Sequence, residues 1–332
     1  MTVLVTGAAG FIGSAVCQRL LDEGQSVLGL DNLNSYYAVS LKKSRLGLLR
    51  QPNFEFCHLD VGNTSAVSQE AQNHGVTQIV HLAAQAGVRH SIQHPEEYVS
   101  ANLVGFAGML ELARNLHVEH FVYASSSSVY GANTKIPYSV ADEVNHPVSF
   151  YAATKRANEV MAESYSHLFD IPSTGLRFFT AYGPFGRPDM AIPGFTKKII
   201  EGEPVRLFGD GLLTRDFTYI DDVVTGVLLC LAKPPTRQHG APGPRLNETT
   251  SPHRVLNVGN GKPVSVLEVL DELEREIGKP AIRQLVETQP GDVDHTLADI
   301  SQTTEWCGYL PTTEIATGIP NFVRWYRDYY GA

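Results

Sequence analysis

Short runs of apolar and β-branched residues alternate with helix-like patterns through the first half of the chain. The runs predict strands at residues 3–5, 26–30, 54–59, 78–82, 121–124 and 173–178. Between them, apolar residues recur three or four positions apart, which predicts helices at 13–23, 98–116 and 151–168. Strands that alternate with helices form a parallel sheet with helices on both faces. We therefore predict an α/β fold, a Rossmann-type doubly wound parallel sheet.

The pattern changes after Tyr182. Residues 183–195 predict a loop, followed by a helix at 196–201 and a strand at 205–208. The polar stretch 233–254 holds five of the 19 prolines and predicts a long surface loop. A strand at 255–258 and helices at 266–277 and 319–329 follow, and Ser265 with Glu268 has the spacing of a capping box. We predict a dinucleotide-binding domain over 1–180 and a smaller α/β substrate domain over 181–332, with some segments returning to the first domain.

Three glycines lie between the first predicted strand and the first predicted helix. Gly7, Gly10 and Gly13 fall in the segment TGAAGFIG, where glycines let the backbone approach a pyrophosphate at a helix N-terminus. Asp31 ends the second strand, where a carboxylate accepts ribose hydroxyls and repels a 2′-phosphate, so NAD is favoured over NADP. Asp60 ends the third strand and is placed to meet the adenine. The alternatives are a structural turn for the glycines and a strand-end cap for Asp60.

A phenol and an ammonium lie one helical turn apart on one predicted helix. Tyr151 and Lys155 share a face of that helix. A serine run, Ser125–Ser128, ends the strand at 121–124, at the carboxyl edge of the sheet where ligands of such folds bind. A Tyr–Lys pair at this spacing is a weak signal by itself, and a core tyrosine with a surface lysine is the alternative. The preceding serine run favours the catalytic interpretation.

Taken together, the motifs resemble those of the extended short-chain dehydrogenase/reductase family of nucleotide-sugar enzymes. They are TGAAGFIG, DNLN, LAAQAGVR, SSSSVYG, the Tyr151–Lys155 pair and RDFTYIDD, and they span nearly the whole chain. Three further segments are most similar to UDP-glucuronate 4-epimerases: DNLNSYY at 31–37, RFFTAYGPFGRPDMA at 177–191 and QPGDV at 289–293.

The resemblance implies the conversion of UDP-glucuronate to UDP-galacturonate through a transient 4-keto sugar. It assigns Tyr151 as the base, Lys155 as the group that lowers the pKa of Tyr151 and binds the nicotinamide ribose, and Ser126 as the proton relay. A phenol with an ordinary pKa of about 10 needs such neighbours to act as a base at neutral pH. NAD would stay tightly bound and be regenerated in each cycle. The alternatives are another UDP-sugar 4-epimerase, acting on UDP-glucose or UDP-N-acetylglucosamine, a UDP-glucuronate decarboxylase, and a non-catalytic NAD sensor.

Two sets of contacts follow from the motifs. We expect the cofactor to be bound by Gly7, Ala9, Gly10, Phe11, Ile12, Gly13, Asp31, Asn32, Asn34, Asp60, Val61, Ala83, Ala84, Gln85, Asn102, Tyr151 and Lys155. We expect the substrate to be bound by Arg89, Ser126, Ser127, Ser128, Tyr151, Thr180, Arg187, Phe208, Arg215 and Asp292. No metal is expected. For Phe208 a place in the core is an equal alternative to packing on uracil.

The serine run also bears on the type of reaction. Dehydratases and decarboxylases of this family carry a carboxylate just before Val-Tyr-Gly, where this chain has Ser128, and residues 125–130 hold no Asp or Glu. A 4-keto uronic acid loses CO₂ readily, so an epimerase should hold the sugar carboxylate with neutral hydrogen bonds. Ser127, Ser128 and Thr180 supply such hydroxyls, and Thr180 stands where UDP-glucose epimerases usually have Asn. The alternative is that the serines only cap the strand end.

The balance of charge excludes one class of partner. The 332 residues include 26 Lys and Arg against 35 Asp and Glu, a net charge of −9, which argues against nucleic acid. A UDP-sugar must then be held by individual arginines, for which paired N–H donors suit phosphate and carboxylate. The candidates are Arg215, Arg89 and Arg187, each with a solvent-exposed role as the alternative. Gln289 stands where several relatives have Arg, which puts a second diphosphate contact in doubt.

Further expectations concern location and assembly. The four cysteines are scattered, and the chain opens on an apolar strand without a leader or a long apolar span, so we expect a cytoplasmic protein without a membrane partner. The predicted helices at 98–116 and 151–168 carry apolar or small residues around much of their circumference. In this family such a pair forms a four-helix interface in a homodimer, with burial inside one chain as the alternative.

Overall fold

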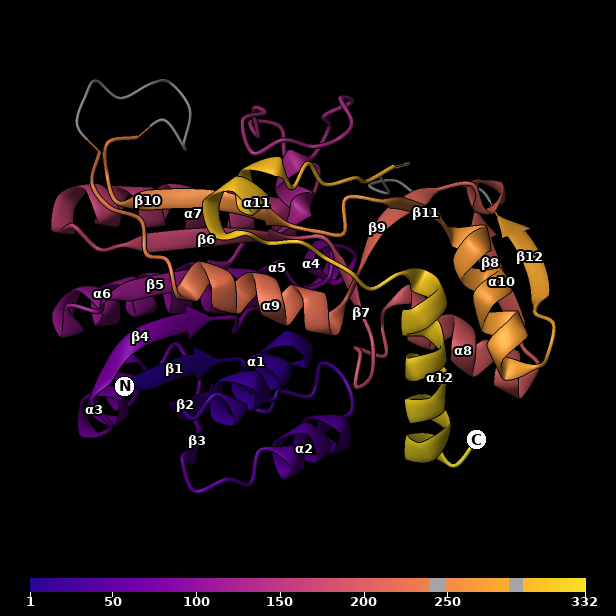
Figure 1. Cartoon of the computed structure of the whole chain (residues 1–332), viewed down its shortest axis with the longest axis horizontal. Coiled ribbons are helices and arrows are strands. Elements are labelled where there is room, and N and C mark those ends of the chain that lie inside the picture. Colours follow the sequence, from indigo (N-terminus) through magenta and orange to yellow (C-terminus); the bar gives the residue numbers. More distant parts are fainter. Residues whose placement is uncertain (239–248, 287–294) are drawn as a thin grey trace.

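A seven-stranded parallel sheet forms the centre of the molecule. The computed structural model describes residues 1–238, 249–286 and 295–332. The strands lie in the order β10-β6-β5-β4-β1-β2-β3 (Figure 1). Their bounds are Thr2–Thr6 for β1, Ser26–Asp31 for β2, Phe54–His58 for β3, Val76–His81 for β4, His120–Ala124 for β5, Ser173–Phe178 for β6 and His253–Val258 for β10. The Rossmann-type fold predicted from the alternating pattern is confirmed.

Helices cover both faces of this sheet. One face carries α1 (Phe11–Asp22) and α9 (Ile220–Leu231), with α2 (Val39–Leu48) beside α1. The other carries α3 (Thr64–Asn73), α6 (Phe106–Leu116) and α7 (Phe150–Phe169). The central strands are therefore buried on both sides, which is why β1 and β5 contain uninterrupted apolar runs. Within the described ranges, no helix has the length and apolar character needed to cross a membrane.

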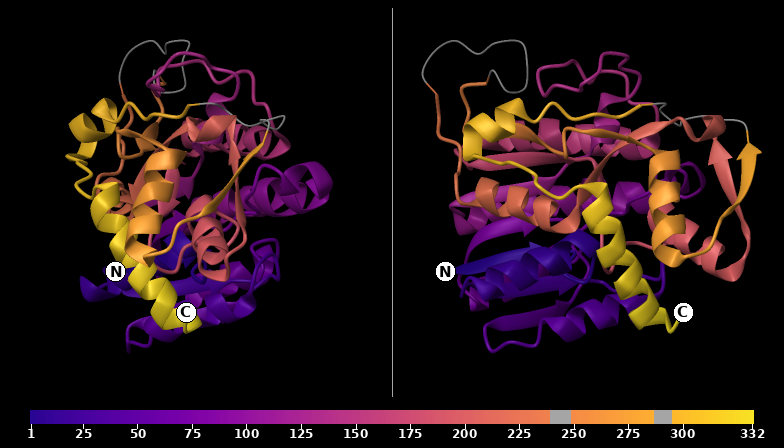
Figure 2. Two further views of the ribbon diagram at one scale, coloured as in Figure 1. Left: turned by 90° about the vertical axis from the view of Figure 1, so that its right-hand side faces the viewer. Right: turned by 45° about the vertical axis from the view of Figure 1, so that its right-hand side comes forward.

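A smaller group of elements lies beyond the carboxyl ends of the large sheet (Figure 2). It contains a parallel pair, β8 (Pro204–Phe208) with β12 (Ile282–Val286), and a three-stranded sheet of β7 (Thr180–Tyr182), β9 (Thr214–Tyr219) and β11 (Pro263–Ser265). Helices α8 (Ala191–Glu201) and α12 (Ile315–Tyr330) pack against α10 (Val266–Ile277). Helix α11 (Ser301–Cys307) packs on β10. The domain boundary at residue 180 stays a prediction. From the C-terminal half of the chain, β10 joins the large sheet and α9 joins the helical layer on one of its faces.

Element ends differ from the sequence pattern in several places. Helix α8 begins at Ala191, inside the predicted loop 183–195. Pro193 lies in its first turn, where backbone N–H groups have no hydrogen-bond partner within the helix, so a proline is tolerated there. Helix α12 begins at Ile315 instead of 319. The sequence analysis did not identify helices α2, α3, α9 and α11 or strands β7, β9, β11 and β12. Of the predicted loop 233–254, residues 239–248 lie outside the described residues, and β10 begins at His253. The capping box of Ser265 and Glu268 is confirmed.

The predicted helix at 98–116 is interrupted. A short helix, α5 (Pro95–Tyr98), runs into a wide π-helical turn over Val99–Gly105 before α6 begins. This turn buries the side chain of Asn102, which accepts a hydrogen bond from the backbone of Gln85 (2.8 Å) and donates to the carbonyl of the same residue (3.0 Å). Its own carbonyl accepts from the Asn158 side chain (2.6 Å). A wide turn of this kind often lies beside a functional site, and here it fixes the segment that follows β4.

A buried carboxylate joins helix α7 to the ends of two strands. Glu159 accepts hydrogen bonds from Arg177 of β6 (2.8 and 2.9 Å) and from the hydroxyl of Ser125 (2.6 Å), directly after β5. Arg156, one turn earlier on α7, lies 3.1 Å away. Burial would raise the pKa of Glu159, but the charge and hydrogen bonds of Arg177 hold it below its ordinary value. Glu159 therefore carries its charge in the core.

The substitution Glu159→Gln should lower the free energy of unfolding by about 3–5 kcal/mol, because it leaves the buried guanidinium of Arg177 without its counter-charge. Urea denaturation followed by circular dichroism measures this change. The control is Glu272→Gln, which removes the partner of Arg275 on the surface and should cost at most about 1 kcal/mol. Equal losses in the two variants would contradict a structural role for the buried pair.

Candidate active site

A cavity of about 410 Å³ opens at the carboxyl ends of the central strands. The strand order reverses between β1 and β4, and open α/β sheets bind ligands at such a point. Of the predicted cofactor contacts, those that line the cavity are Gly7, Gly10, Phe11, Ile12, Gly13, Asp31, Asn32, Asn34, Asp60, Val61, Ala83, Ala84, Gln85, Tyr151 and Lys155. Ala9 and Asn102 are buried but do not line it. The cavity therefore gathers segments that lie far apart in the sequence.

The glycine turn could not be built from other residues. Gly7 has a φ of +73°, and a Cβ on Gly13 would lie 2.0 Å from the carbonyl oxygen of Gly7. A Cβ on Gly10 would lie 2.9 Å from that same oxygen. Helix α1 begins directly after Gly10 without a side-chain cap. Its first N–H groups are thus left for a ligand, and with the partial positive charge of the helix end they suit a pyrophosphate.

Acidic and amide side chains form the wall beside the turn. Asp31 is fixed by the backbone N–H groups of Ala9 (3.2 Å) and Leu33 (2.8 Å), and the ammonium of Lys42 lies 3.6 Å from it. Asp60 accepts from the side chain of Asn32 (2.6 Å) and from the backbone of Gly62 (2.8 Å). Asp60 therefore acts as the strand-end cap that the sequence left open, and it also lines the cavity.

The segment after β4 presents one polar group without a partner. The backbone of Gln85 is held on both sides by Asn102, and its buried side-chain nitrogen has no hydrogen-bond acceptor among the residues that the structure describes. A buried donor without an acceptor is costly, so a ligand that accepts from it would be favoured. This donor, the glycine turn and the carboxylate of Asp31 together fit a dinucleotide such as NAD.

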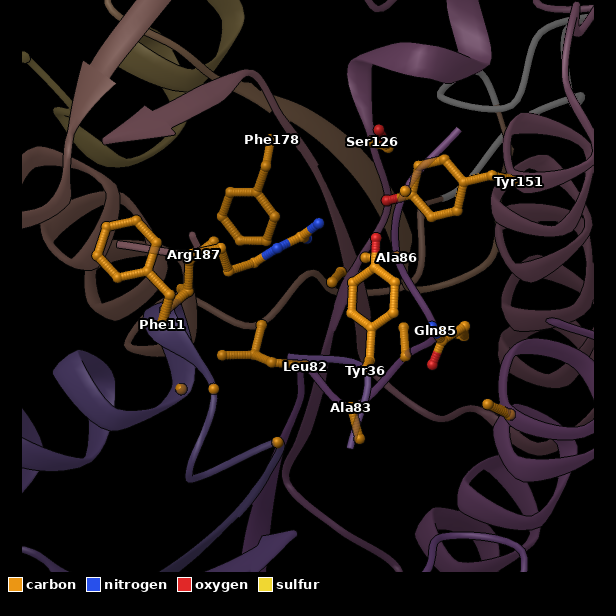
Figure 3. A pocket seen from close by; sticks show the side chains of 18 of the residues that line it. Phe11, Tyr36, Leu82, Ala83, Gln85, Ala86, Ser126, Tyr151, Phe178 and Arg187 are labelled. Atoms are coloured by element: carbon orange, nitrogen blue, oxygen red, sulfur yellow. The ribbon is translucent and has the colours of Figure 1, made fainter. Parts of the chain in front are cut away.

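The phenol, the ammonium and the serine run meet at one side of the cavity. Figure 3 shows the hydroxyl of Tyr151 pointing towards Ser126. Burial raises the pKa of Tyr151, while its hydrogen bond with Ser126 and the positive charge of Arg187 act in the opposite direction. The ammonium of Lys155 donates to the carbonyl of Ala124 (2.9 Å), and burial lowers its pKa to about 8. Arg187 is thus one cation that acts on the phenol, and the same role for Lys155 stays a prediction.

The predicted substrate contacts fall into two groups. Those that line the cavity are Ser126, Ser127, Ser128, Tyr151, Thr180 and Arg187. Arg89, Phe208 and Arg215 do not line it, and Asp292 lies outside the described residues. The guanidinium of Arg89 lies over the ring of Phe208 at 5.4 Å, whereas Arg215 donates to the carbonyl of Thr214 (2.9 Å). The structure thus brings Arg89 and Phe208 together outside the lining of the cavity.

Several cavity residues were not assigned from the sequence. They include Tyr36, Tyr37, Lys42, Phe178 and Met190. The two tyrosines belong to the segment DNLNSYY, which was quoted only for its resemblance, so the signal was present without a role. Lys42 lies on α2, a helix that the sequence analysis did not identify.

Comparison with known proteins identifies the family. Residues 3–247 match the NAD dependent epimerase/dehydratase family. The chain is 42% identical over 334 residues to a probable UDP-glucuronate 4-epimerase of Rhizobium meliloti, covering 99% of this chain and 98% of that protein. It is 43% identical over 335 residues to UDP-glucuronate 4-epimerase 4 of Arabidopsis thaliana, covering 99% of this chain and 76% of that protein.

A solved structure has the same fold throughout. It is the UDP-glucuronic acid 4-epimerase of Bacillus cereus in complex with UDP-glucuronic acid and NAD, with a TM-score of 0.87 and 34% sequence identity. The match covers 99% of this chain and 100% of that one. The resemblance predicted from the motifs is confirmed, as is NAD as the cofactor. The chain belongs to the NAD-dependent epimerase/dehydratase family.

Proposed function

We propose that the chain interconverts UDP-glucuronate and UDP-galacturonate by epimerisation at C4, with NAD bound throughout. The observation that carries this proposal is the composition of one cavity. It joins Tyr151 and Lys155 to an edge of uncharged hydroxyls, Ser127, Ser128 and Thr180, with Arg187 also in the lining. The curated relatives and the Bacillus cereus structure support the same substrate.

Tyr151 is the base in this proposal. When bound, NAD supplies a hydride acceptor that becomes the hydride donor for the return step. The phenol takes the proton of the sugar 4-hydroxyl, with Ser126 as the relay, and returns it after the 4-keto sugar has turned over. Because burial opposes the phenolate, positive charge close to the ring is needed, and Arg187 supplies it. Lys155 is held against Ala124, where it can bind the nicotinamide ribose.

The hydroxyl edge separates this reaction from decarboxylation. Within the serine run, Ser127 and Ser128 both line the cavity, and position 128 offers no carboxylate for acid–base work on the keto sugar. Neutral hydrogen bonds from these serines and from Thr180 would fix the sugar carboxylate close to the carbonyl plane. In that orientation the C–C bond to CO₂ does not align with the π system of the ketone. The decarboxylase alternative is therefore disfavoured.

The nucleotide is proposed to bind outside the described cavity. The ring of Phe208, at the end of β8, lies 5.4 Å from the guanidinium of Arg89 and 5.9 Å from that of Arg206. An aromatic ring beside two cations suits a base that stacks and a diphosphate that needs counter-charges. Arg215 of β9 is assigned to the same proposed UDP site, and Asp292, outside the described residues, stays a predicted contact.

We also propose that the reaction takes place in the cytoplasm. Cys17, Cys57, Cys230 and Cys307 are all free thiols, as is usual in reducing compartments. UDP-galacturonate made there would serve polysaccharide biosynthesis.

A homodimer is proposed through two helical segments. Val104 of the π-helical turn is 57% exposed and Val160 of α7 is 50% exposed, and the two segments pack against each other. Paired apolar side chains at this exposure favour a four-helix contact with a second copy. Light scattering should give twice the chain mass, and the double variant Val104→Lys/Val160→Lys should give the mass of one chain. A wild-type mass of one chain would contradict the dimer.

The function is tested by an NMR time course with UDP-glucuronate and no added NAD. We expect UDP-galacturonate to accumulate until the two sugars reach equilibrium, without a UDP-pentose signal, because the cofactor is retained and the carboxylate is fixed. Ser128→Glu and Thr180→Ala should each add a UDP-pentose signal, since the first introduces a carboxylate and the second removes a hydroxyl from the edge.

UDP-glucose and UDP-N-acetylglucosamine serve as the comparison substrates. Faster turnover of either one would favour another 4-epimerase, and a pentose product from the wild type would favour the decarboxylase. Unchanged product ratios in both variants would contradict the role assigned to the hydroxyl edge.

A further inference from the structure

The loop that carries Arg187 is tied to the N-terminal part of the chain at two points. The hydroxyl of Tyr36 donates to the carboxylate of Asp189 (3.1 Å) across 153 positions of sequence. The guanidinium of Arg45 donates to the carbonyl of Phe185 through Nε (3.1 Å) and Nη2 (2.6 Å). Residues 183–190 are therefore held from both ends by the segment that follows β2.

Asp189 fixes the guanidinium of Arg187. The Nε and Nη2 groups of Arg187 donate to the two oxygens of Asp189 (3.0 and 2.6 Å), a two-pronged geometry that sets the plane of the guanidinium. Burial alone would raise the pKa of Asp189, but its contacts with Arg187 and Tyr36 lower it, so the carboxylate stays charged. The side chain of Arg187 reaches into the cavity (Figure 3).

Tyr36 is held so that its hydroxyl donates to Asp189. Its oxygen lies over Gly87, where a Cβ would come within 2.6 Å, and its ring packs against His90 at 4.8 Å. Burial and the neighbouring carboxylate of Asp189 raise the pKa of Tyr36 to about 12. The phenol is thus neutral over the ordinary range of pH and can donate throughout it.

Arg45 connects the same loop to the glycine turn. Its guanidinium is fully buried and donates to the carbonyl of Ala9 (2.9 Å) and to the hydroxyl of Tyr37 (2.6 Å), besides Phe185. Phe185 adopts a left-handed conformation, with φ +61°, and packs on Trp325 at 4.9 Å. One side chain therefore links the proposed pyrophosphate site with the loop that carries Arg187.

We propose that Tyr36, Asp189 and Arg45 form a clasp that positions Arg187 for an anionic group on the sugar and keeps the dinucleotide in the cavity. The clasp joins two walls of the cavity, since Tyr36 comes from the segment after β2 and Arg187 from the loop after β7. The segment after β2 must move away from the loop after β7 before a large ligand can leave the cavity. The three clasp members are positioning residues, and their role in sugar selection rests on the proposed function.

The test compares Asp189→Asn and Tyr36→Phe with the wild type and with Glu274→Gln. Glu274 forms a two-pronged pair with Arg283 on the surface (3.2 and 2.9 Å), so its variant removes similar contacts away from the cavity. Calorimetry should show UDP-glucuronate binding weakened about tenfold by Asp189→Asn, the size expected for a charge-assisted contact, with UDP-glucose changed less than about twofold. The NAD that remains after gel filtration should fall in both clasp variants and stay at the wild-type level in Glu274→Gln.

The two readouts separate the clasp from the proposed function. If the wild type does not bind UDP-glucuronate, the proposed function is wrong, and the retained NAD alone then decides whether the clasp exists. If both clasp variants keep wild-type NAD and wild-type preference for the acidic sugar, the clasp is refuted, even where their melting temperatures fall. Because Tyr36→Phe keeps the ring and removes only the hydroxyl, it tests the contact without emptying the site.

Discussion

The buried carboxylate of Glu159 determines where the catalytic groups can lie. It sits on the same helix as Tyr151 and Lys155, and it accepts hydrogen bonds from Ser125 at the end of β5 and from Arg177 of β6. The helix, the serine run and the strand that leads to Thr180 are therefore fixed to one another by a single charged group. A charge in the core is tolerated only when it is fully paired, so small shifts of α7 along the sheet are disfavoured. This rigidity gives a phenol and a serine hydroxyl a constant separation.

Electrostatics at the site is a balance between burial and a few cations. Burial raises the pKa of Tyr151 and lowers that of Lys155, so the same dry environment disfavours both the phenolate and the ammonium that should assist it. Arg187 offsets this cost, and its own charge is secured by Asp189. An acidic protein can therefore bind an anionic nucleotide-sugar with individually placed guanidinium groups. Arg187 is held by the clasp and its charge also acts on Tyr151, which ties sugar selection to the ease of forming the phenolate.

Local signals in the sequence predicted the parallel sheet, the glycine turn and the helix carrying Tyr151 and Lys155. Each depends on residues close together in the chain: the TGAAGFIG segment, the run Ser125–Ser128, the capping pair of Ser265 and Glu268. The sequence did not predict the π-helical turn at Asn102 or the clasp. Both depend on contacts between distant segments, as in the bond of Tyr36 to Asp189. Phe208 and Arg215 were predicted as substrate contacts together with Ser126, but strands β8 and β9 place them outside the lining of the cavity that holds Ser126.

The central claim is that the phenol of Tyr151 removes the proton from the sugar 4-hydroxyl. The most direct measurement compares Tyr151→Phe with the wild type for both binding and turnover of UDP-glucuronate. We expect the variant to bind UDP-glucuronate with wild-type affinity and to form UDP-galacturonate at least about 10²–10⁴-fold more slowly, the usual size of a general-base contribution. Formation of UDP-galacturonate at the wild-type rate would contradict the account.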